Sequence, residues 1–347
     1  MTSLPAYDPD QSYRWNYDHA PGQPVDVDVP PLPGDWTFCG LPVASPLGIP
    51  AGPLLNGKWI LYYASLGFDV LTYKTVRSGS RECYPLPNLV PVSVDSMTGN
   101  EESVAEAVHQ TGSWAVSFGM PSASPDVWRK DIAETRRRLP EGKLLAVSVV
   151  GTIQPDWTIE DLADDYALCA RWAAESGTDC VEANLSCPNV STCDGQLYQR
   201  PDDAAVVAQR IRAAVPDRPF LVKIGHVPDR DAAVSLLDSI GPSVDGIVMT
   251  NSVAAVVEAQ DGRRLFDGAR RGICGRATRQ ASLAQVRMFA SLVRERNLNV
   301  SLIGVGGIGT AADVRAFLDA GAEGVQIATA AMLDPEVALA IRRDWSV

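Results

Sequence analysis

A loop rich in amide side chains, and carrying one thiol, follows a short apolar run near the middle of the chain. It reads Asn184-Leu185-Ser186-Cys187-Pro188-Asn189. Amides both donate and accept hydrogen bonds, so Asn184 and Asn189 suit a ligand that alternates carbonyl and N–H groups. A thiol, with a reference pKa of about 8.5, exchanges a proton near neutrality when a nearby cation favours the thiolate. Taken alone, Cys187 is more typical of an inert buried thiol, and Asn189 of a helix cap.

Two lysines lie at the ends of apolar runs, Lys74 within Leu71–Thr75 and Lys223 within Leu221–Ile224. A lysine is rarely buried without a partner. At the mouth of a barrel, either ammonium could stabilise a developing anion, or form a Schiff base if its pKa were depressed. For either lysine alone, a rim position with the ammonium in solvent is an equally good interpretation.

Two turns near the C-terminus have the composition of a phosphate site. Gly306-Gly307 follows one predicted strand and precedes a helix, and Ala328-Thr329 ends the next strand. Glycines let backbone N–H groups approach a phosphate, and barrels often bind phosphate after strands seven and eight. A glycine pair by itself is also an ordinary tight turn. The second turn in the following unit favours phosphate binding.

These residues must be positioned by the elements that precede them. Apolar runs alternate with segments of helical periodicity from Val43 onward, which is typical of βα units around a parallel sheet. Eight strands alternating with helices favour an α/β fold of the closed (β/α)8 TIM barrel type, although periodicity alone does not exclude an open doubly wound sheet. The predicted strands are Pro46–Ala51, Val70–Thr75, Leu144–Val150, Cys180–Leu185, Phe220–Ile224, Gly246–Thr250, Val300–Gly304 and Gly324–Ala328. The predicted helices include Thr158–Ser176, Asp202–Ala214, Arg279–Arg296 and Ala311–Ala320.

Two segments fall outside this rhythm. Residues 1–35 are rich in proline, which denies a chain regular hydrogen bonding, and in aromatic residues. We therefore predict an extended arm over 1–35, packed on the barrel or on a second subunit, with a disordered tail as the alternative. Residues 36–347 form the predicted barrel domain. The insertion between Arg81 and Asp126, after the second strand, is suited to carry an active-site loop.

Composition and charge bound the class of protein. The 347 residues include 46% hydrophobic and 21% charged residues, which is typical of a globular protein. The net charge of −12 argues against nucleic acid and anionic membranes as partners, although a local basic pocket can still hold a small anion. The seven cysteines form no CxxC pair and no zinc-like spacing with histidine, so we expect reduced thiols and no metal. Without a signal-peptide pattern or a long apolar run, we expect a cytoplasmic protein.

The Asn184–Asn189 loop resembles the signature loop of the dihydroorotate dehydrogenase family, which also covers the pyrimidine-binding domain of dihydropyrimidine dehydrogenase. The resemblance extends over roughly residues 43–340 and leaves out the arm. Members of the soluble class have cysteine at the position of Cys187, whereas the membrane-associated class has serine. Segments that resemble the family in the same order are Ser45–Pro53, Leu71–Thr75, Ser117–Pro121, Val222–Lys223, Thr250–Ser252, Gly272–Gly275 and the two C-terminal turns.

This resemblance implies a barrel that binds FMN. Ala51 and Gly52 would lie against the flavin ring, and Asn184 would bridge flavin and substrate. Lys223 would lie beside the N1/O2 edge of the ring, where a positive charge stabilises the reduced flavin. The other implied cofactor contacts are Lys74, Thr75, Thr250, Gly275, Gly306, Gly307, Ala328 and Thr329. The implied substrate contacts are Lys74, Ser117, Asn184, Asn189, Asn251 and Ser252.

The resemblance also implies a reaction. Oxidation of a dihydropyrimidine removes a proton from one carbon and a hydride from its neighbour, and the hydride passes to flavin N5. Cys187 would be the base, and in the reverse direction it would be the general acid for reduction of an activated C=C bond. The predicted function is therefore that of an FMN-dependent oxidoreductase of the dihydroorotate dehydrogenase type, acting on CH–CH bonds.

One stretch departs from the family pattern. Members that bind orotate usually have asparagine before the Ser-Phe-Gly-Met-Pro stretch and another amide after it, whereas this chain has Val116 and Ser122. Valine cannot supply the hydrogen bonds of a carboxamide, and each unmet polar group on a bound ligand costs about 1–3 kcal/mol. Either the substrate is less polar than orotate, or Ser117 and Ser122 compensate.

Several partners and alternative functions follow from these observations. The resemblance implies a homodimer, and electrons that pass to fumarate, to quinone or to a separate electron-transfer subunit; the absence of an apolar N-terminal helix argues against quinone. An FMN-dependent ene-reductase or desaturase acting on a less polar substrate is the first alternative. A flavin-free lyase or isomerase with a Schiff base on Lys223 is the second, and a barrel kept only for binding or subunit contact is the third.

Overall fold

Eight parallel strands close into a barrel in the computed structural model, which describes residues 4–186 and 196–346. Each strand runs as an apolar stretch because helices cover the outside of the barrel and side chains fill its interior. All seven residues of the second barrel strand, for example, are buried. In their order around the barrel, the strands are β10 (Phe220–Lys223), β11 (Gly246–Met249), β14 (Ser301–Val305), β15 (Gly324–Gln326), β3 (Leu47–Ile49), β4 (Val70–Val76), β8 (Leu144–Val149) and β9 (Cys180–Asn184).

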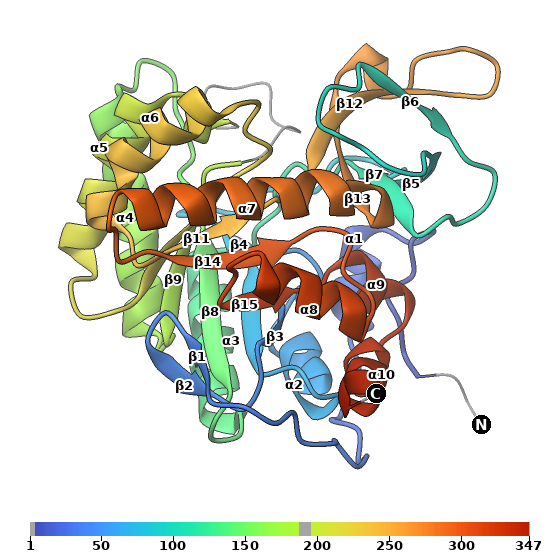
Figure 1. Cartoon of the computed structure of the whole chain (residues 1–347), viewed down its shortest axis with the longest axis horizontal. Coiled ribbons are helices and arrows are strands. Elements are labelled where there is room, and N and C mark those ends of the chain that lie inside the picture. The colour runs from blue at the N-terminus through green and yellow to red at the C-terminus, as the bar shows by residue number, and fades with distance from the viewer. Residues whose placement is uncertain (1–3, 187–195, 347) are drawn as a thin grey trace.

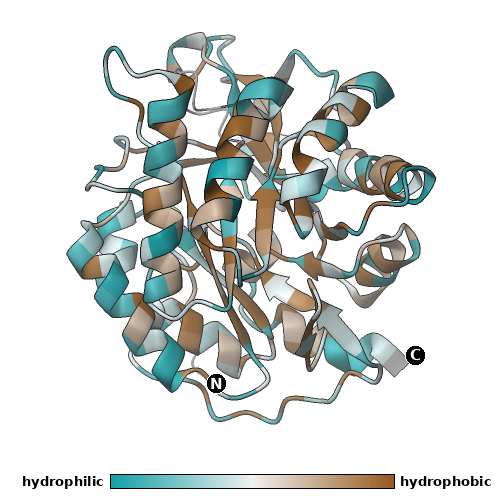
Figure 2. Cartoon of the chain, turned by 90° about the vertical axis from the view of Figure 1, so that its left-hand side faces the viewer, coloured by the Kyte–Doolittle hydropathy of each residue, from teal (hydrophilic) through white to brown (hydrophobic). Residues whose placement is uncertain are grey.

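Helices follow the barrel strands and pack around them (Figure 1). Figure 2 shows the apolar strands enclosed by helices whose polar faces point outward, as expected for amphipathic helices on a buried sheet. Two helices begin with reciprocal capping boxes, at Thr158 with Asp161 and at Thr310 with Asp313. The helices around the barrel are α2 (Gly57–Ser65), α3 (Pro125–Arg138), α4 (Ile159–Glu175), α5 (Pro201–Ala214), α6 (Arg230–Ile240), α7 (Arg279–Glu295), α8 (Ala311–Asp319), α9 (Thr329–Leu333) and α10 (Val337–Arg343).

The predicted barrel is confirmed, and the open doubly wound sheet is excluded by the closed strand order. Each of the eight predicted strands overlaps an observed barrel strand, with ends that differ by one or two residues. The four predicted helices correspond to α4, α5, α7 and α8 in the same way. Helix and strand ends are the least certain part of any such prediction, because end residues lack one side of the hydrogen-bond pattern.

The insertion after β4 folds into part of a second, smaller sheet. Its strands are β5 (Leu89–Ser93), β6 (Ser103–Glu106) and β7 (Ser113–Val116), which pair with β12 (Val253–Glu258) and β13 (Arg271–Gly275) from the segment after β11. These five strands close on themselves around a separate apolar cluster that includes Val92, Val257 and Ile273. Both insertions follow the carboxyl ends of barrel strands, so the small sheet stands over the barrel mouth on one side (Figure 1).

The N-terminal segment lies along α2, held by side chains that bond to its backbone. The Tyr62 hydroxyl donates to the Pro5 carbonyl at 2.7 Å, Asn56 Nδ2 donates to the Tyr17 carbonyl at 2.9 Å, and Trp59 Nε1 donates to the Asn16 carbonyl at 3.1 Å. A short helix, α1 (Tyr13–Asp18), forms in a stretch without proline, where the Ser12 side chain accepts from Trp15 N. The prediction of a wholly extended arm is therefore wrong for these six residues.

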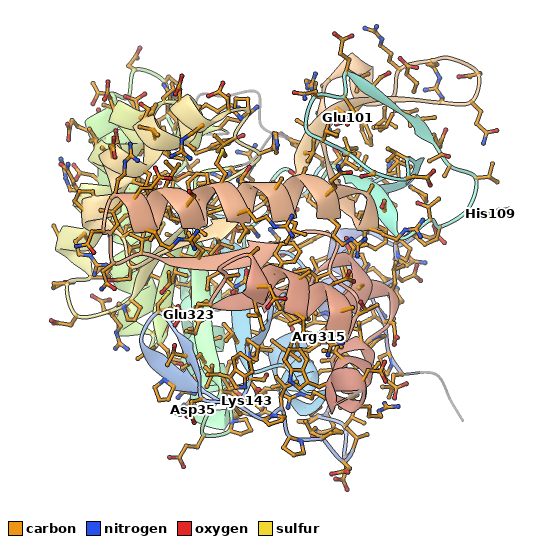
Figure 3. All side chains as sticks on the ribbon, viewed as in Figure 1. Asp35, Glu101, His109, Lys143, Arg315 and Glu323 are labelled. Atoms are coloured by element: carbon orange, nitrogen blue, oxygen red, sulfur yellow. The ribbon has the colours of Figure 1, made fainter. Side chains whose placement is uncertain are left out.

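A hairpin of β1 (Trp36–Phe38) and β2 (Leu41–Val43) lies at the amino ends of the barrel strands. Glu323, just before β15, accepts hydrogen bonds from Thr37 Oγ1 at 2.5 Å and Cys39 N at 3.1 Å. Figure 3 shows Glu323, Asp35 and Lys143 at this end of the molecule, away from Glu101 and His109 on the small sheet. Among the described helices, none has both the length and the apolar character needed to cross a membrane.

Candidate active site

Two adjoining cavities open at the carboxyl ends of the barrel strands, which is where active sites of such barrels lie. Their volumes are about 260 and about 130 Å³. We call the first the cradle and the second the chamber. The two share the lining residues Asn251, Cys274, Val305, Ala328 and Thr329, so one ligand can extend from one into the other.

The cradle is built from glycine turns after β13 and β14. Gly275 has φ of +97°, and a Cβ there would overlap the Gly112 carbonyl oxygen; Gly306 has φ of +118°, and a Cβ there would overlap Ser282 Oγ. Only glycine fits both positions, so the backbone at these two turns approaches its neighbours more closely than any side chain would allow. Gly307 also lines the cradle, as do Ala328 and Thr329. The cation among these lining residues is Arg276.

Buried polar atoms without partners lie at the cradle and beside the residues that line it. Gln326 Oε1, Ser282 Oγ and Thr250 Oγ1 have no hydrogen-bond partner within the described chain. Gln326 lines the cradle directly, while its Nε2 donates to Thr72 Oγ1 at 3.1 Å. Thr250 lines neither cavity and lies at the end of β11 beside β14, where its N–H donates to the Val305 carbonyl at 2.8 Å. Unmet polar atoms are costly when buried, and a bound polar ligand would satisfy those that face it.

The chamber is lined from the ends of β3, β4, β9 and β10. Ala51 and Gly52 follow β3, and Gly52 has open space around its α carbon, as a flat ring lying against it would require. Pairing between β4 and β8 changes register between Tyr73 and Val76. Such an irregularity turns side chains next to a site, and here the stretch carries Lys74 and Thr75, both at the chamber.

Asn184 is held by its neighbours at the end of β9. Its Oδ1 accepts from Ser186 N at 3.0 Å, and its Nδ2 lies 3.5 Å from Thr75 Oγ1 and 3.6 Å from Met120 Sδ. Thr75 Oγ1 is in turn 3.1 Å from Ser148 Oγ. These weak contacts leave the amide available to a ligand in the chamber while its orientation is fixed by the Ser186 bond.

Lys223 is a fully buried cation beside a fully buried carboxyl group. Burial lowers the pKa of Lys223, and Glu182 and Cys274 oppose that shift. Burial raises the pKa of Glu182, opposed by Lys223 and by a hydrogen bond from Ser148. Lys223 Nζ lies 3.5 Å from the Ala51 carbonyl, so the ammonium reaches the floor of the chamber. Lys223 therefore places its ammonium group next to a ligand that lies against Ala51.

Cys274 is a second thiol at this site. Its Sγ lies 3.6 Å from the Asn251 carbonyl, and burial raises its pKa to about 11. It therefore remains a neutral thiol at physiological pH. Asn251 itself lines both cavities, and its Nδ2 donates to the Ser186 carbonyl at 2.7 Å.

Two predicted substrate contacts lie elsewhere. Ser117 does not line the chamber, and its Oγ accepts from Arg271 Nε at 3.1 Å. Ser252 lines a neighbouring hollow with Tyr198 and His226. In both cases the preceding residue, Val116 or Asn251, faces the chamber, because successive side chains of an extended backbone point in opposite directions.

The remaining predicted residues, Cys187 and Asn189, lie outside the described residues. Ser186, the residue before Cys187 in the sequence, lines the chamber. The chamber also contains residues for which the sequence predicted no role at the site, among them Tyr7, Trp114 and Met332. Of the missed residues, Cys274 was within reach of sequence reasoning because it precedes Gly275. Among the described residues, no cluster of histidine, cysteine or carboxylate side chains is suited to hold a metal.

The fold and these cavities define a class of protein: a TIM barrel whose mouth combines an anion cradle with a chamber that contains a buried cation. The sequence profile of the dihydroorotate dehydrogenase family matches residues 35–345. The chain belongs to this family of flavin-using oxidoreductases that act on CH–CH bonds.

Known proteins support this assignment. Dihydroorotate dehydrogenase of Dictyostelium discoideum is 30% identical over 357 residues, which cover 96% of each chain. The catalytic subunit of dihydroorotate dehydrogenase B (NAD(+)) from Desulforudis audaxviator is 26% identical and covers 88% of this chain. A solved structure of dihydroorotate dehydrogenase from Eimeria tenella, in complex with ferulenol, matches with a TM-score of 0.76. At 19% identity over 96% of this chain, that structure supports the fold alone.

Proposed function

We propose that the cradle and the chamber together hold FMN. The phosphate would lie against the backbone of Gly275, Gly306 and Gly307, where a Cβ has no room, with Ala328 and Thr329 beside it. The ring would lie over Ala51 and Gly52, near Lys74, Thr75 and Asn184. Thr250 remains a proposed cofactor contact on the strength of its unpartnered hydroxyl at the end of β11. The continuity of the two cavities is the observation that carries this proposal.

We infer that the reaction is oxidation of a dihydropyrimidine, with dihydroorotate as the default substrate. When bound, FMN supplies the acceptor for a hydride from one substrate carbon. Cys187 takes the proton from the neighbouring carbon, or returns it in the reverse direction, as a general base or acid. Lys223 holds positive charge at the chamber floor, where it favours the negative charge that builds up during the transfer. The polar edge of the substrate forms hydrogen bonds with the amides of Asn184, Asn189 and Asn251.

A less polar substrate is the second candidate, with the protein acting as an ene-reductase or desaturase. Val116 lines the chamber where orotate-binding members have an amide. Ser122 cannot replace that amide, because its Oγ accepts from Arg77 N at 3.1 Å and donates to the Ala123 carbonyl at 2.9 Å. Ser117 is engaged with Arg271. The Schiff-base lyase has no comparable support, since the family consists of oxidoreductases.

We further propose an electron acceptor and an oligomeric state for the protein. Several relatives are catalytic subunits of dihydroorotate dehydrogenase B (NAD(+)), a name that supports a separate electron-transfer subunit for this chain. A homodimer remains our prediction from the resemblance, and a cytoplasmic location remains our prediction from the sequence pattern. Fumarate remains an alternative acceptor.

Anaerobic reduction of the purified protein tests the proposal. We expect a yellow protein with about one FMN per chain, bleached by L-dihydroorotate. Cys187→Ser should keep FMN and slow the bleaching by about 100-fold or more, because serine is a far weaker base. A matched control is Cys39→Ser, since Cys39 lies in the β1–β2 hairpin at the other end of the barrel and outside both cavities.

The outcomes separate the candidates. A colourless protein that takes up no FMN contradicts flavin chemistry altogether. A yellow protein that L-dihydroorotate does not bleach favours the less polar substrate. Bleaching at an unchanged rate in Cys187→Ser removes the thiol from the role of base.

A further inference from the structure

The N-terminal segment contributes one side chain to the chamber. Tyr7 lines it, is 6% exposed, and its hydroxyl has no hydrogen-bond partner within the described chain. A buried phenol normally finds a partner, because an unmet hydroxyl costs free energy. The Tyr7 hydroxyl is therefore an unused hydrogen-bonding group at the wall of a ligand cavity.

The ring of Tyr7 and the backbone on both sides of it are held in place. The Tyr7 ring packs edge-on against Phe118, with ring centroids 6.3 Å apart. Two residues earlier, the Pro5 carbonyl accepts from the Tyr62 hydroxyl on α2 at 2.7 Å. One residue later, Asp8 N donates to the Oδ1 atom of the buried Asn16 at 2.9 Å. The backbone around Tyr7 is thus fixed, and the side chain has the order that recognition requires.

Tyr7 and Lys74 line the same chamber. Cys83 lies close enough to contribute to the raised pKa of Tyr7, and Lys74 in turn acts to lower the pKa of Cys83. The chamber lining also includes the apolar residues Val116, Phe118 and Leu89. Ser117 and Ser122 do not replace the missing amides, because both are engaged elsewhere. Tyr7 therefore offers a neutral donor on a part of the chamber wall that it shares with the apolar ring of Phe118.

Burial also fixes the protonation state of the phenol. It raises the pKa of Tyr7 above the ordinary value, and Cys83 and Asp8 raise it further. The hydroxyl thus stays protonated throughout the physiological range and can donate a hydrogen bond. The matching group on a ligand is an acceptor oxygen.

We propose that Tyr7 determines substrate specificity by donating a hydrogen bond to a carbonyl or carboxylate oxygen of the substrate. The proposal rests on the proposed function, because it takes the chamber to be the substrate site. The chain would then replace an amide from the barrel insertion with a phenol from its N-terminal segment.

Tyr7→Phe tests this proposal, since it removes the hydroxyl and keeps the ring against Phe118. In the FMN-loaded protein, we expect the Kd for orotate, followed by the change in flavin absorbance, to rise about tenfold, as for loss of one hydrogen bond. The KM for L-dihydroorotate should rise similarly, while the maximal rate of bleaching and the FMN content stay close to those of the wild type. Tyr13→Phe is the control, because Tyr13 packs on Phe118 at the same 6.3 Å but does not line the chamber.

Each outcome has a distinct meaning. Weaker orotate binding in Tyr7→Phe alone supports the proposal. Unchanged binding in Tyr7→Phe overturns it and leaves the proposed function intact. Equal weakening in both variants also overturns it, because packing of the segment would then be responsible. A wild-type protein that neither binds orotate nor is bleached by L-dihydroorotate contradicts the proposed function and this inference together.

Discussion

At the scale of single residues, the buried pair of Lys223 and Glu182 has the largest expected effect on the chemistry of the site. Both are almost completely buried, with exposed fractions of 2% and 1%. A buried charge is tolerated only when a partner offsets its desolvation, and each residue opposes the effect of burial on the pKa of the other. Glu182 Oε1 has no hydrogen-bond partner in the described chain. The protonation of the Lys223–Glu182 pair is therefore sensitive to a ligand bound in the chamber.

This balance predicts the alkaline side of the pH profile. Burial lowers the pKa of Lys223 below its ordinary value of 10.5, so the ammonium is present at low pH and is lost as pH rises through the lowered pKa. If that charge assists flavin reduction, the rate falls at alkaline pH. In Lys223→Arg the fall should move to higher pH, because a guanidinium stays protonated. The measurement is the rate of anaerobic flavin reduction between about pH 6 and 10.

The same experiment distinguishes the lysine from other groups. The acid side of the profile should stay where it is in Lys223→Arg, because a guanidinium does not titrate there. An alkaline fall at the same pH in wild type and variant would assign it to another group and contradict the role of Lys223. FMN content, measured in parallel, reports any loss of binding caused by the larger guanidinium.

Among the elements, the small sheet matters because it completes the cradle. Gly275 ends β13, where its φ of +97° and its approach to Gly112 in the β6–β7 connection bring two insertions together. The Gly112 carbonyl also accepts from Arg276 N at 2.9 Å. The wall of the proposed phosphate site thus depends on strands that are not part of the barrel.

Gly275→Ala should therefore damage cofactor binding. The added Cβ overlaps the Gly112 carbonyl oxygen, and the left-handed backbone is unfavourable for alanine. We expect the Kd for FMN, measured by quenching of flavin fluorescence, to rise at least about tenfold. Gly262→Ala is a matched control, since its φ is +82° but no atom lies within 4 Å of the added Cβ. Equal losses in both variants would show that backbone strain, and not the overlap, is responsible.

The elements also show how far the sequence could predict the structure. Barrel strands such as Val70–Val76 were predictable because burial on both faces produces a continuous apolar run. Strands β6 and β12 were not, because β6 has little apolar character and its partner lies about 150 residues away, at Val256–Glu258. Gly306 and Lys223 were found through composition and resemblance. The aromatic residues of the N-terminal segment predicted that it packs on the barrel or on a second subunit. The position of Tyr7 at the chamber was not predicted, since it depends on how Tyr62 and Asn16 anchor the backbone.

At the scale of the whole molecule, the two ends of the barrel have different tasks. The cradle, the chamber and the small sheet lie at the carboxyl ends of the strands, whereas the other end holds a buried ionic network. There, Arg342 of α10 donates to Asp69 Oδ2 at 2.6 Å, to Ser45 Oγ at 2.8 Å and to the Pro30 carbonyl at 2.9 Å. Lys143 donates to Asp69 Oδ1 at 2.6 Å. The network joins the N-terminal segment, the barrel and the last helix.

Asp69→Asn should therefore destabilise the protein without affecting the site. Arg342 and Asp69 are each only 3% exposed at the side chain, so the substitution leaves a guanidinium buried without its counter-charge. Breaking such a pair costs about 3–5 kcal/mol. Thermal unfolding should shift down by several degrees, while the FMN content and orotate affinity of the folded fraction stay unchanged, because the network lies at the opposite end of the barrel. Asp238→Asn, which breaks an exposed pair with Arg296, should cost less than about 1 kcal/mol, and equal losses would mean that burial of the Asp69 network adds nothing.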